Sequence, residues 1–201
     1  MESKLFTPVT FGPLTLRNRT IRSAAFESMC PGNAPSDMLL NYHRSVAAGG
    51  IGMTTVAYAA VTRSGLSFDR QLWMRPEIIP GLRRLTDAVH AEGAAAGIQL
   101  GHCGNMSHKS ICGCTPVGAS GGFNLYSPTF VRGLRADELP ELARAYGRSV
   151  NLAREAGFDA VEIHAGHGYL ISQFLSPATN HRKDEFGGSL QNRMRFMDMV
   201  L

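Results

Sequence analysis

The chain has 201 residues, of which 44% are hydrophobic and 18% charged, values typical of a folded globular domain with its own core. Its net charge of +4 comes from scattered basic residues without a long basic block, which argues against a nucleic-acid partner. No apolar run reaches the roughly 18 residues that span a bilayer, and residues 1–8 lack the basic and apolar parts of a secretory signal. We therefore expect a cytoplasmic protein with no membrane partner.

Strand-like segments alternate with helix-like segments along the chain, which predicts a parallel sheet built from βα units. The first segment, residues 6–16, is expected to form a small hairpin or lid, because Pro8, Gly12 and Pro13 interrupt it. Strands are predicted at residues 20–25, 51–61, 94–100 and 159–164. Helices are predicted at residues 38–48, 76–91, 137–156 and 189–201. Residues 103–134, rich in Gly, Ser, Pro and Asn, are expected to form a long functional or mobile loop.

Two histidines and a tyrosine gather after the fourth predicted strand, within the segment from His164 to Tyr169. Residues three apart in a straight strand point to opposite faces, so His164 and His167 can share a site only if the chain turns between them. Gly166 and Gly168 are expected to supply the freedom for that turn. Loops after barrel strands are where TIM-type enzymes hold their catalytic residues. The alternative is a pair of structural histidines bonded to loop backbone.

Two further stretches hold polar residues near predicted strand ends. Gln99 interrupts an apolar strand, and its amide offers a donor and an acceptor that suit the edge of a heterocycle. A bond from Gln99 to neighbouring backbone is the alternative. Residues 170–195 contain a tight turn at Gly187-Gly188 and an N-cap at Ser189, so we expect this stretch to be scaffold rather than catalyst.

The cysteines and histidines near residue 110 raise the alternative of a metal-binding protein. The candidate ligands are His102, Cys103, His108, Cys112 and Cys114. The Cys-Gly-Cys spacing differs from the Cys-x-x-Cys knuckle of zinc sites, and no second knuckle follows. We therefore expect no metal and reduced thiols, and elemental analysis would separate the two hypotheses.

Three segments resemble, in the same order, the Old Yellow Enzyme, or NADH:flavin oxidoreductase, family. They are residues 11–19, residues 99–104 and, most specifically, residues 159–196. The resemblance implies an α/β fold of the TIM (β/α)8-barrel family. Residues 1–201 would be its N-terminal half, an incomplete barrel with about four βα units and an N-terminal hairpin, truncated after the fourth unit. Family members take the flavin phosphate site from later strands, so this segment alone is expected to be inactive.

The resemblance also implies a reaction. FMN, reduced by NADH or NADPH, passes hydride to the activated C=C bond of a small α,β-unsaturated carbonyl compound, an enone or enoyl substrate. His164 and His167 are implied to bind the carbonyl oxygen, where negative charge develops, and Tyr169 to protonate the α-carbon. An iron–sulfur cluster and FAD belong to a further C-terminal part of long family members, and the resemblance leaves a homo-oligomer open.

The implied flavin contacts come from the ends of the first three strands. They are Ser23, Ala24, Ala25, Phe26, Tyr58 and Gln99. Phe26 stands where many members have a Thr or Cys that bonds the flavin O4, and Tyr58 is bulkier than the residue expected there. These departures bear on redox potential and substrate more than on reaction class. The competing hypothesis is a non-catalytic half-barrel or interaction module without the cofactor phosphate site, and coding sequence beyond Leu201 would decide between them.

Overall fold

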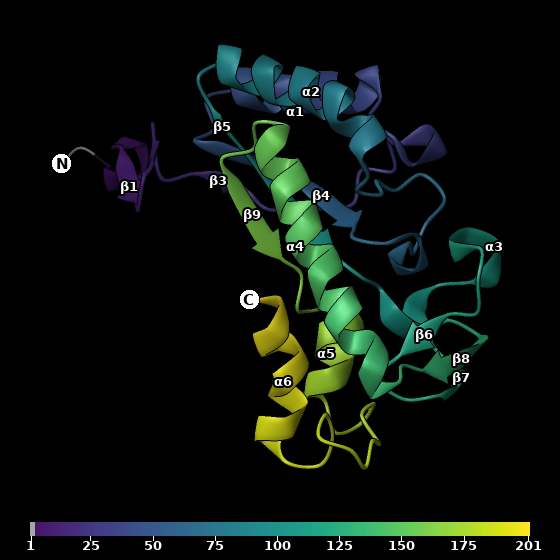
Figure 1. Ribbon diagram of the computed structural model, residues 1–201. Coiled ribbons are helices and arrows are strands. Elements are labelled where there is room, and N and C mark those ends of the chain that lie inside the picture. Colours follow the sequence, from purple (N-terminus) through teal and green to yellow (C-terminus); the bar gives the residue numbers. More distant parts are fainter. Residues whose placement is uncertain (1–2) are drawn as a thin grey trace. The chain divides into compact units, whose positions relative to one another are not determined.

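The computed structural model describes residues 3–201, which divide into two compact units. The first unit consists of the described part of Met1–Ala59 together with Arg70–Gln99 and Val150–Glu162. The second consists of Ala60–Asp69, Leu100–Ser149 and Ile163–Leu201. Figure 1 labels the helices and strands of both. Each unit is thus assembled from three separate segments of the chain.

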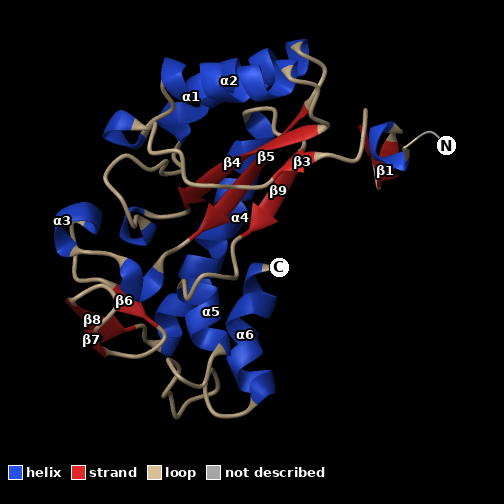
Figure 2. Ribbon diagram, turned by 180° about the vertical axis from the view of Figure 1, so that it is seen from behind, coloured by secondary structure: helices blue, strands red, loops and turns tan. Residues whose placement is uncertain are grey.

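A four-stranded sheet with the order β3-β4-β5-β9 forms the centre of the first unit. Its strands are β3 (Ile21–Arg22), β4 (Met53–Ala60), β5 (Ala95–Gly101) and β9 (Ala160–Ile163). β3 and β4 are parallel, with Ile21 opposite Met53, and the arrows of β4, β5 and β9 run the same way in Figure 2. β4 is buried along all but its first residue, as expected for an apolar strand covered on both faces. A strand lies at each of the four predicted positions, although the first covers only Ile21–Arg22 of the predicted residues 20–25.

Two helices of the first unit lie side by side in Figures 1 and 2. They are α1 (Asp37–Ala48) and α2 (Ile79–Ala91), the second preceded by the 3₁₀ turn η4 (Pro76–Ile78). The predicted N-cap of α1 is confirmed, since Ser36 Oγ accepts the Leu39 N–H at 3.2 Å. The Arg17 guanidinium joins the ends of both helices by donating to the carbonyls of Ala47 at 2.5 Å and Glu92 at 2.8 Å.

The predicted N-terminal hairpin is also confirmed. β1 (Val9–Phe11) and β2 (Leu14–Leu16) are antiparallel, and Gly12 at their turn has a φ of +53°. The remaining short elements of this unit are the 3₁₀ turns η1 (Lys4–Phe6) and η2 (Pro31–Asn33).

The second unit contains a small three-stranded sheet with the order β6-β8-β7 and several short helices. The strands are β6 (Val117–Gly118), β7 (Gly122–Asn124) and β8 (Thr129–Gly133). The helical elements are η3 (Arg63–Gly65), η5 (Gly104–Met106), α3 (Lys109–Cys112), η6 (Ala136–Glu138), α5 (Leu170–Leu175) and α6 (Leu190–Val200). Ser189 Oγ caps α6 by accepting the Asn192 N–H at 3.2 Å, as predicted.

The expectation of an irregular loop over residues 103–134 is wrong, because this segment forms the three-stranded sheet. Phe123 and Phe130 face each other across β7 and β8, with ring centroids 5.1 Å apart. A Cβ at Gly133 would lie 3.0 Å from the Gly121 backbone nitrogen. Gly133 therefore allows two backbone segments to approach closely, and its role is not to make a loop mobile.

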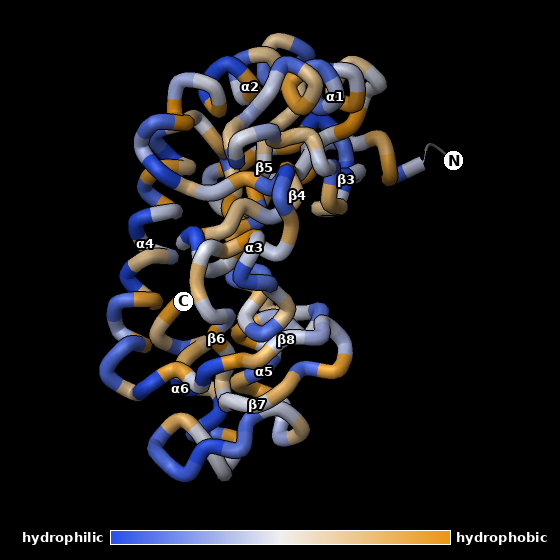
Figure 3. Tube along the Cα trace, turned by 90° about the vertical axis from the view of Figure 1, so that its right-hand side faces the viewer, coloured by the Kyte–Doolittle hydropathy of each residue, from blue (hydrophilic) through white to orange (hydrophobic). Residues whose placement is uncertain are grey.

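Helix α4 (Leu139–Glu155) is shared between the units, with its residues up to Ser149 assigned to the second. Buried residues recur along it at intervals of three and four, at Leu139, Leu142, Tyr146, Ser149 and Ala153, with Ala145 also buried beside Tyr146. Hydrophilic and hydrophobic positions alternate along it in Figure 3, as expected for an amphipathic helix. Within residues 3–201, no helix has the length and apolar character needed to cross a membrane.

Candidate active site

The segment after β9 turns sharply and brings its two histidines together within the second unit. His167 and Gly168 have left-handed φ angles of +56° and +67°. The rings of His164 and His167 consequently meet edge to face, with centroids 4.9 Å apart. Gly166 is not among the left-handed residues, so its predicted part in the turn is corrected: the strained position belongs to His167. A residue other than glycine in this region costs about 1–3 kcal/mol, and such strain gathers at functional sites.

Hydrogen bonds constrain which ring nitrogens of His164 and His167 carry protons. The Gly166 N–H donates to His164 Nδ1 at 3.2 Å, so the His164 proton is on Nε2. That Nε2 lies 2.9 Å from His167 Nδ1 and donates to it. His167 therefore holds its own proton on Nε2. This nitrogen points away from His164 and is an N–H donor.

Tyr169 completes the cluster. Its ring centroid lies 4.9 Å from that of His164 and 6.3 Å from that of His167. Burial raises the pKa of Tyr169 above the usual range of a tyrosine, and a side-chain hydrogen bond with Ser67 offsets part of that shift. The phenol is therefore protonated at neutral pH and has the form that a proton donor requires.

Gln173 in α5 holds the histidine turn in place. Its Nε2 donates to the Gly168 carbonyl at 2.7 Å, to Asn105 Oδ1 at 3.0 Å and to the Cys103 carbonyl at 3.1 Å. Its Oε1 accepts the Asn105 N–H at 3.2 Å. Gln173 is 1% exposed, so these bonds satisfy a fully buried amide. This residue fits the scaffold role expected for residues 170–195.

A cavity of about 490 Å³ opens beside His167, a size suited to a small organic molecule. Gly168, Asn105 and the β7–β8 hairpin contribute to its wall. The apolar lining residues are Met106, Phe123, Leu125, Tyr126 and Val131. Sequence reasoning missed them because the hairpin itself was not predicted. The aromatic residues in an otherwise Gly-rich and Ser-rich stretch were the available signal.

The expected flavin contacts lie in the first unit, beginning with the segment after β3. Ser23, Ala24, Ala25 and Phe26 are outside regular secondary structure, and Phe26 is 42% exposed. Ser23, Ala24 and Ala25 have small side chains, and the Ala25 carbonyl accepts a bond from Arg22 Nη2 at 3.2 Å. This is a suitable surface for the polar edge of a planar heterocycle.

A carboxylate missed by sequence reasoning anchors this segment. The Glu27 side chain, 6% exposed, lies 3.0 Å from Arg22 Nη1 and 3.3 Å from His43 Nε2. It also accepts the Ala57 N–H at 3.2 Å. Glu27 is the only charged residue between Arg22 and Pro31, which was the available signal.

Tyr58 and Gln99 occupy neighbouring strands of the same unit. Tyr58 is 5% exposed in β4, and its carbonyl accepts a bond from Gln71 Nε2 at 3.1 Å. Gln99 in β5 is partly exposed, and its Nε2 donates to the Glu162 side chain in β9 rather than to neighbouring backbone. Its amide carbonyl is an acceptor suited to a heterocycle N–H. The chemistry of these groups thus fits the flavin ring.

The metal hypothesis receives no support from the part of the chain that the structure describes. Within residues 3–201, no three His, Cys, Asp or Glu side chains are arranged to hold a metal ion. His102 is instead bonded to the Gly104 N–H at 3.0 Å and to Ser64 Oγ at 3.1 Å. His108 Nε2 is bonded to Ser127 Oγ at 2.8 Å.

The model of the NADH:flavin oxidoreductase / NADH oxidase family matches residues 4–201. The chain belongs to this family. A 4,4'-dithiodibutanoate disulfide reductase of Rhodococcus erythropolis is 43% identical over 197 residues, which are 98% of this chain and 49% of that protein. An NADPH dehydrogenase of Bacillus subtilis is 37% identical over 206 residues, covering 100% of this chain and 60% of that protein. The chain thus spans about half the length of these relatives.

Solved structures of the same family confirm the fold class. The Old Yellow Enzyme homologue from Zymomonas mobilis has a TM-score of 0.91 and 30% identity, covering 98% of this chain and 58% of that one. Morphinone reductase in complex with tetrahydroNAD also has a TM-score of 0.91, with 29% identity over 99% of this chain and 59% of that one. These neighbours are TIM barrels of the Old Yellow Enzyme type, so the resemblance inferred from the motifs is confirmed.

Proposed function

We propose that residues 1–201 are the N-terminal half of a flavin-binding TIM barrel. The whole protein would reduce the activated C=C bond of an α,β-unsaturated carbonyl compound with NADH or NADPH. The observation that carries this proposal is the cluster of His164, His167 and Tyr169 beside a small-molecule cavity, in a chain of the NADH:flavin oxidoreductase family. Relatives named NADPH dehydrogenase and a neighbour solved with tetrahydroNAD support a nicotinamide donor.

The first unit supplies the proposed flavin contacts. The backbone of residues 23–26, the Gln99 amide and the Tyr58 side chain would hold the flavin ring. Glu27 keeps the segment after β3 in position through its contacts with Arg22, His43 and the Ala57 N–H. Bound FMN supplies a hydride that NADH or NADPH replenishes.

The two histidines act on the carbonyl oxygen of the substrate. His167 donates its Nε2–H to that oxygen. His164 Nε2–H donates to His167 Nδ1 in the free protein. In the proposed complex, a side-chain rotation redirects this hydrogen bond to the same substrate oxygen. Negative charge grows on the oxygen as hydride reaches the β-carbon, and two donors placed in advance stabilise that charge.

Tyr169 provides the proton. Its phenolic O–H bond breaks as a C–H bond forms at the α-carbon, and the phenolate then regains a proton from solvent. The hydrogen bond with Ser67 stabilises the phenolate that forms. The apolar part of the substrate packs against Phe123 and Tyr126, which line the cavity beside His167.

The test uses the full-length, FMN-loaded protein under anaerobic conditions in a stopped-flow spectrometer. NADPH or NADH should bleach the flavin absorbance, 2-cyclohexenone should then restore it, and cyclohexanone should accumulate. A protein that takes up hydride from the nicotinamide but is not reoxidised by the enone would contradict the proposed substrate class. A protein that binds no FMN would favour the non-catalytic half-barrel.

A second substrate class is suggested by the relative named 4,4'-dithiodibutanoate disulfide reductase, which is 43% identical. The same site would then reduce an organic disulfide. Running 4,4'-dithiodibutanoate beside 2-cyclohexenone separates the two. Faster flavin reoxidation by the disulfide would select the second class.

A further inference from the structure

Two thiols outside the proposed active site lie close together at the end of α3. The Sγ atoms of Cys112 and Cys114 are 3.7 Å apart, and both cysteines are free. A disulfide has an S–S distance of about 2.05 Å, so the two sulfurs must approach further before the bond can form. The spacing of the Cys-Gly-Cys motif does not fit a metal knuckle. The short distance between its sulfurs points instead to disulfide chemistry.

The residue between the cysteines makes this geometry possible. Gly113 has a left-handed φ of +76° and ends α3. A Cβ at this position would lie 3.2 Å from the Cζ atom of Arg63, so the turn suits glycine both in conformation and in space. The Cys112 thiol donates to the Cys114 carbonyl at 3.1 Å, which keeps the two sulfurs on one side of the turn.

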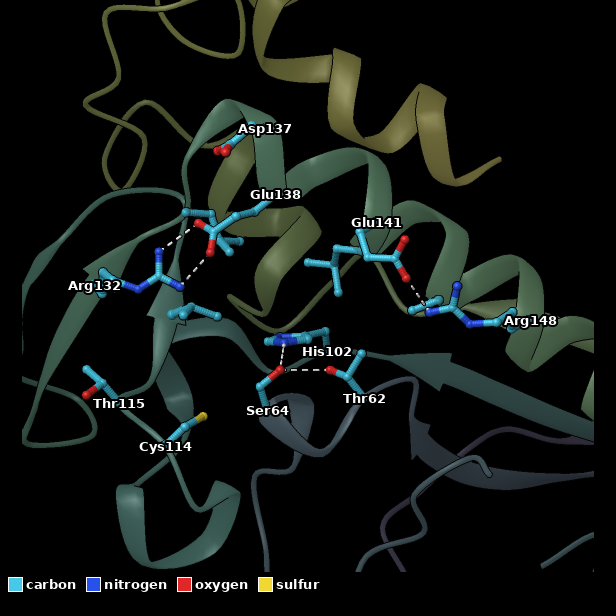
Figure 4. A pocket seen from close by; sticks show the side chains of 14 residues that line it. Thr62, Ser64, His102, Cys114, Thr115, Arg132, Asp137, Glu138, Glu141 and Arg148 are labelled. Atoms are coloured by element: carbon cyan, nitrogen blue, oxygen red, sulfur yellow. Dashed lines mark hydrogen bonds and ion pairs between the residues drawn. The ribbon is translucent and has the colours of Figure 1, made fainter. Parts of the chain in front are cut away.

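The two cysteines differ in accessibility. Cys112 is 2% exposed, whereas Cys114 is exposed and lines a second cavity, of about 620 Å³. Figure 4 shows Cys114 there with Thr115, Arg132 and Ser64. An external reagent can therefore reach Cys114 but not Cys112. An accessible cysteine beside a buried partner is the arrangement of an attacking and a resolving thiol.

The surroundings of Cys114 change the pKa of its thiol and therefore its reactivity. Local burial and the interaction with Cys112 raise the pKa of the Cys114 thiol, while Arg132 and Arg63 act in the opposite direction. The nucleophile is the thiolate, so reaction at Cys114 should accelerate as pH rises above neutrality.

We propose that Cys112 and Cys114 form a redox-active dithiol that reduces low-molecular-weight disulfides by thiol–disulfide exchange. The Cys114 thiolate attacks one sulfur of the external disulfide, forms a mixed disulfide and releases one thiolate, which takes up a proton. Cys112 then loses its proton and attacks Cys114 Sγ, which forms the Cys112–Cys114 disulfide and releases the second thiol. Two electrons pass from the protein thiols to the external disulfide. No flavin takes part, so this proposal stands apart from the proposed function.

The experiment incubates the full-length protein with oxidised glutathione, without NADH or NADPH. Remaining thiols are alkylated, and the tryptic peptide 110–132, which contains both cysteines and no internal Lys or Arg before Arg132, is examined by mass spectrometry. Wild-type protein should yield this peptide unalkylated and two hydrogens lighter than its dithiol form. This disulfide form should appear more rapidly at about pH 9 than at about pH 7. Recovery of the peptide with both thiols alkylated would overturn the proposal, and this measurement requires no variant.

Three variants test the division of roles. Cys112→Ser should accumulate glutathione on Cys114, because no resolving thiol remains, whereas Cys114→Ser should yield neither product. Cys30→Ser removes a buried cysteine of the first unit and should behave as wild type. An adduct on Cys112 in Cys114→Ser, formed as fast as the wild-type disulfide, would refute the assigned order of attack.

Discussion

The Nε2 atom of His164 lies 2.9 Å from Nδ1 of His167, so the tautomer of His164 determines that of His167. The Gly166 N–H fixes the first proton on His164 Nε2, and that proton in turn fixes the second on His167 Nε2. The Gly166 N–H thus sets both histidines as Nε2–H donors. In the proposed reaction, a substrate oxygen must replace His167 Nδ1 as the acceptor of the His164 proton.

Removal of either histidine should slow alkene reduction strongly. His164→Ala or His167→Ala removes a donor to the developing oxyanion and should cost roughly 2.7–4 kcal/mol, or about a hundredfold or more in rate. The double variant should lose less than the summed single losses, since both donors address one oxygen. Stopped-flow reoxidation by 2-cyclohexenone measures these rates. His90→Ala, a change in the first unit, should leave them unaltered, and an unaffected rate in His164→Ala would contradict the assigned role.

Tyr169→Phe should separate the two half-reactions. Alkene reduction should slow because the proton to the α-carbon is lost, whereas flavin reduction by the nicotinamide should be nearly intact because it needs no proton from Tyr169. The two phases are resolved by sequential mixing in a stopped-flow spectrometer. Equal slowing of both phases would indicate that Tyr169 has only a structural role.

The hydrogen bond between Ser67 and Tyr169 predicts a shift in pH dependence. The phenol donates only when protonated, and its pKa is raised, so alkene reduction should persist above the usual range of tyrosine titration. The Ser67 bond lowers this pKa, so Ser67→Ala should move the basic limb of the pH–rate profile to higher pH. A limb that stays in place, or moves to lower pH, would argue against this contact.

The sequence predicted those parts of the fold and site that depend on local patterns. The apolar run of residues 51–61 became β4, and Ser36 and Ser189 became the expected caps. His164 and His167 were found because one short turn holds both. Sequence reasoning missed the contacts of Ser67, Gln173 and Glu27 with Tyr169, Cys103 and Ala57, each of which joins residues at least 30 positions apart and is encoded by no local pattern. The β7–β8 hairpin was missed because glycine is common both in loops and where two strands approach closely, so glycine content alone does not separate these cases.

Gln173 should be important for both stability and the shape of the active-site turn. Gln173→Leu leaves the Gly168 and Cys103 carbonyls and the Asn105 amide without their buried partner, which should lower the free energy of unfolding by about 1–3 kcal/mol. Urea denaturation measures the change. Gln191→Leu is the matched control, since Gln191 is exposed at the start of α6 and should cost little. Equal losses in both variants would refute the role given to Gln173.

Phe26 tests the proposed flavin contact in the first unit. Phe26→Thr introduces a hydroxyl donor where the family resemblance places the flavin O4. A new bond to this oxygen stabilises the anionic reduced form and should raise the reduction potential. Spectroelectrochemistry of the FMN-loaded protein measures it, with Phe11→Thr in the N-terminal hairpin as a control for loss of an exposed phenylalanine. An unchanged or lower potential would place Phe26 away from the flavin.

His102 provides a prediction about stability that does not depend on the reaction. It is 1% exposed, its Nδ1 accepts the Gly104 N–H, and its Nε2–H donates to Ser64 Oγ. Because Nε2 already carries the proton, His102 cannot take a proton from Ser64 as the base of a hydrolase would. A second proton would have to enter on Nδ1, against the Gly104 N–H. Burial accordingly lowers the pKa of His102 to about 4.

This lowered pKa should make the folded protein lose stability in acid. Between pH 6.5 and about 4, the unfolded chain binds a proton at His102 that the folded chain does not, so unfolding becomes easier as pH falls. At about 1.36 kcal/mol per pKa unit, the loss should approach about 3 kcal/mol by the lower end of that window, with no contribution at neutral pH. Urea denaturation in steps across this range measures the slope. His102→Gln cannot be protonated and should flatten it, whereas His181→Gln, at an exposed position, should keep it. An identical slope in wild type and His102→Gln would show that other groups cause the acid sensitivity.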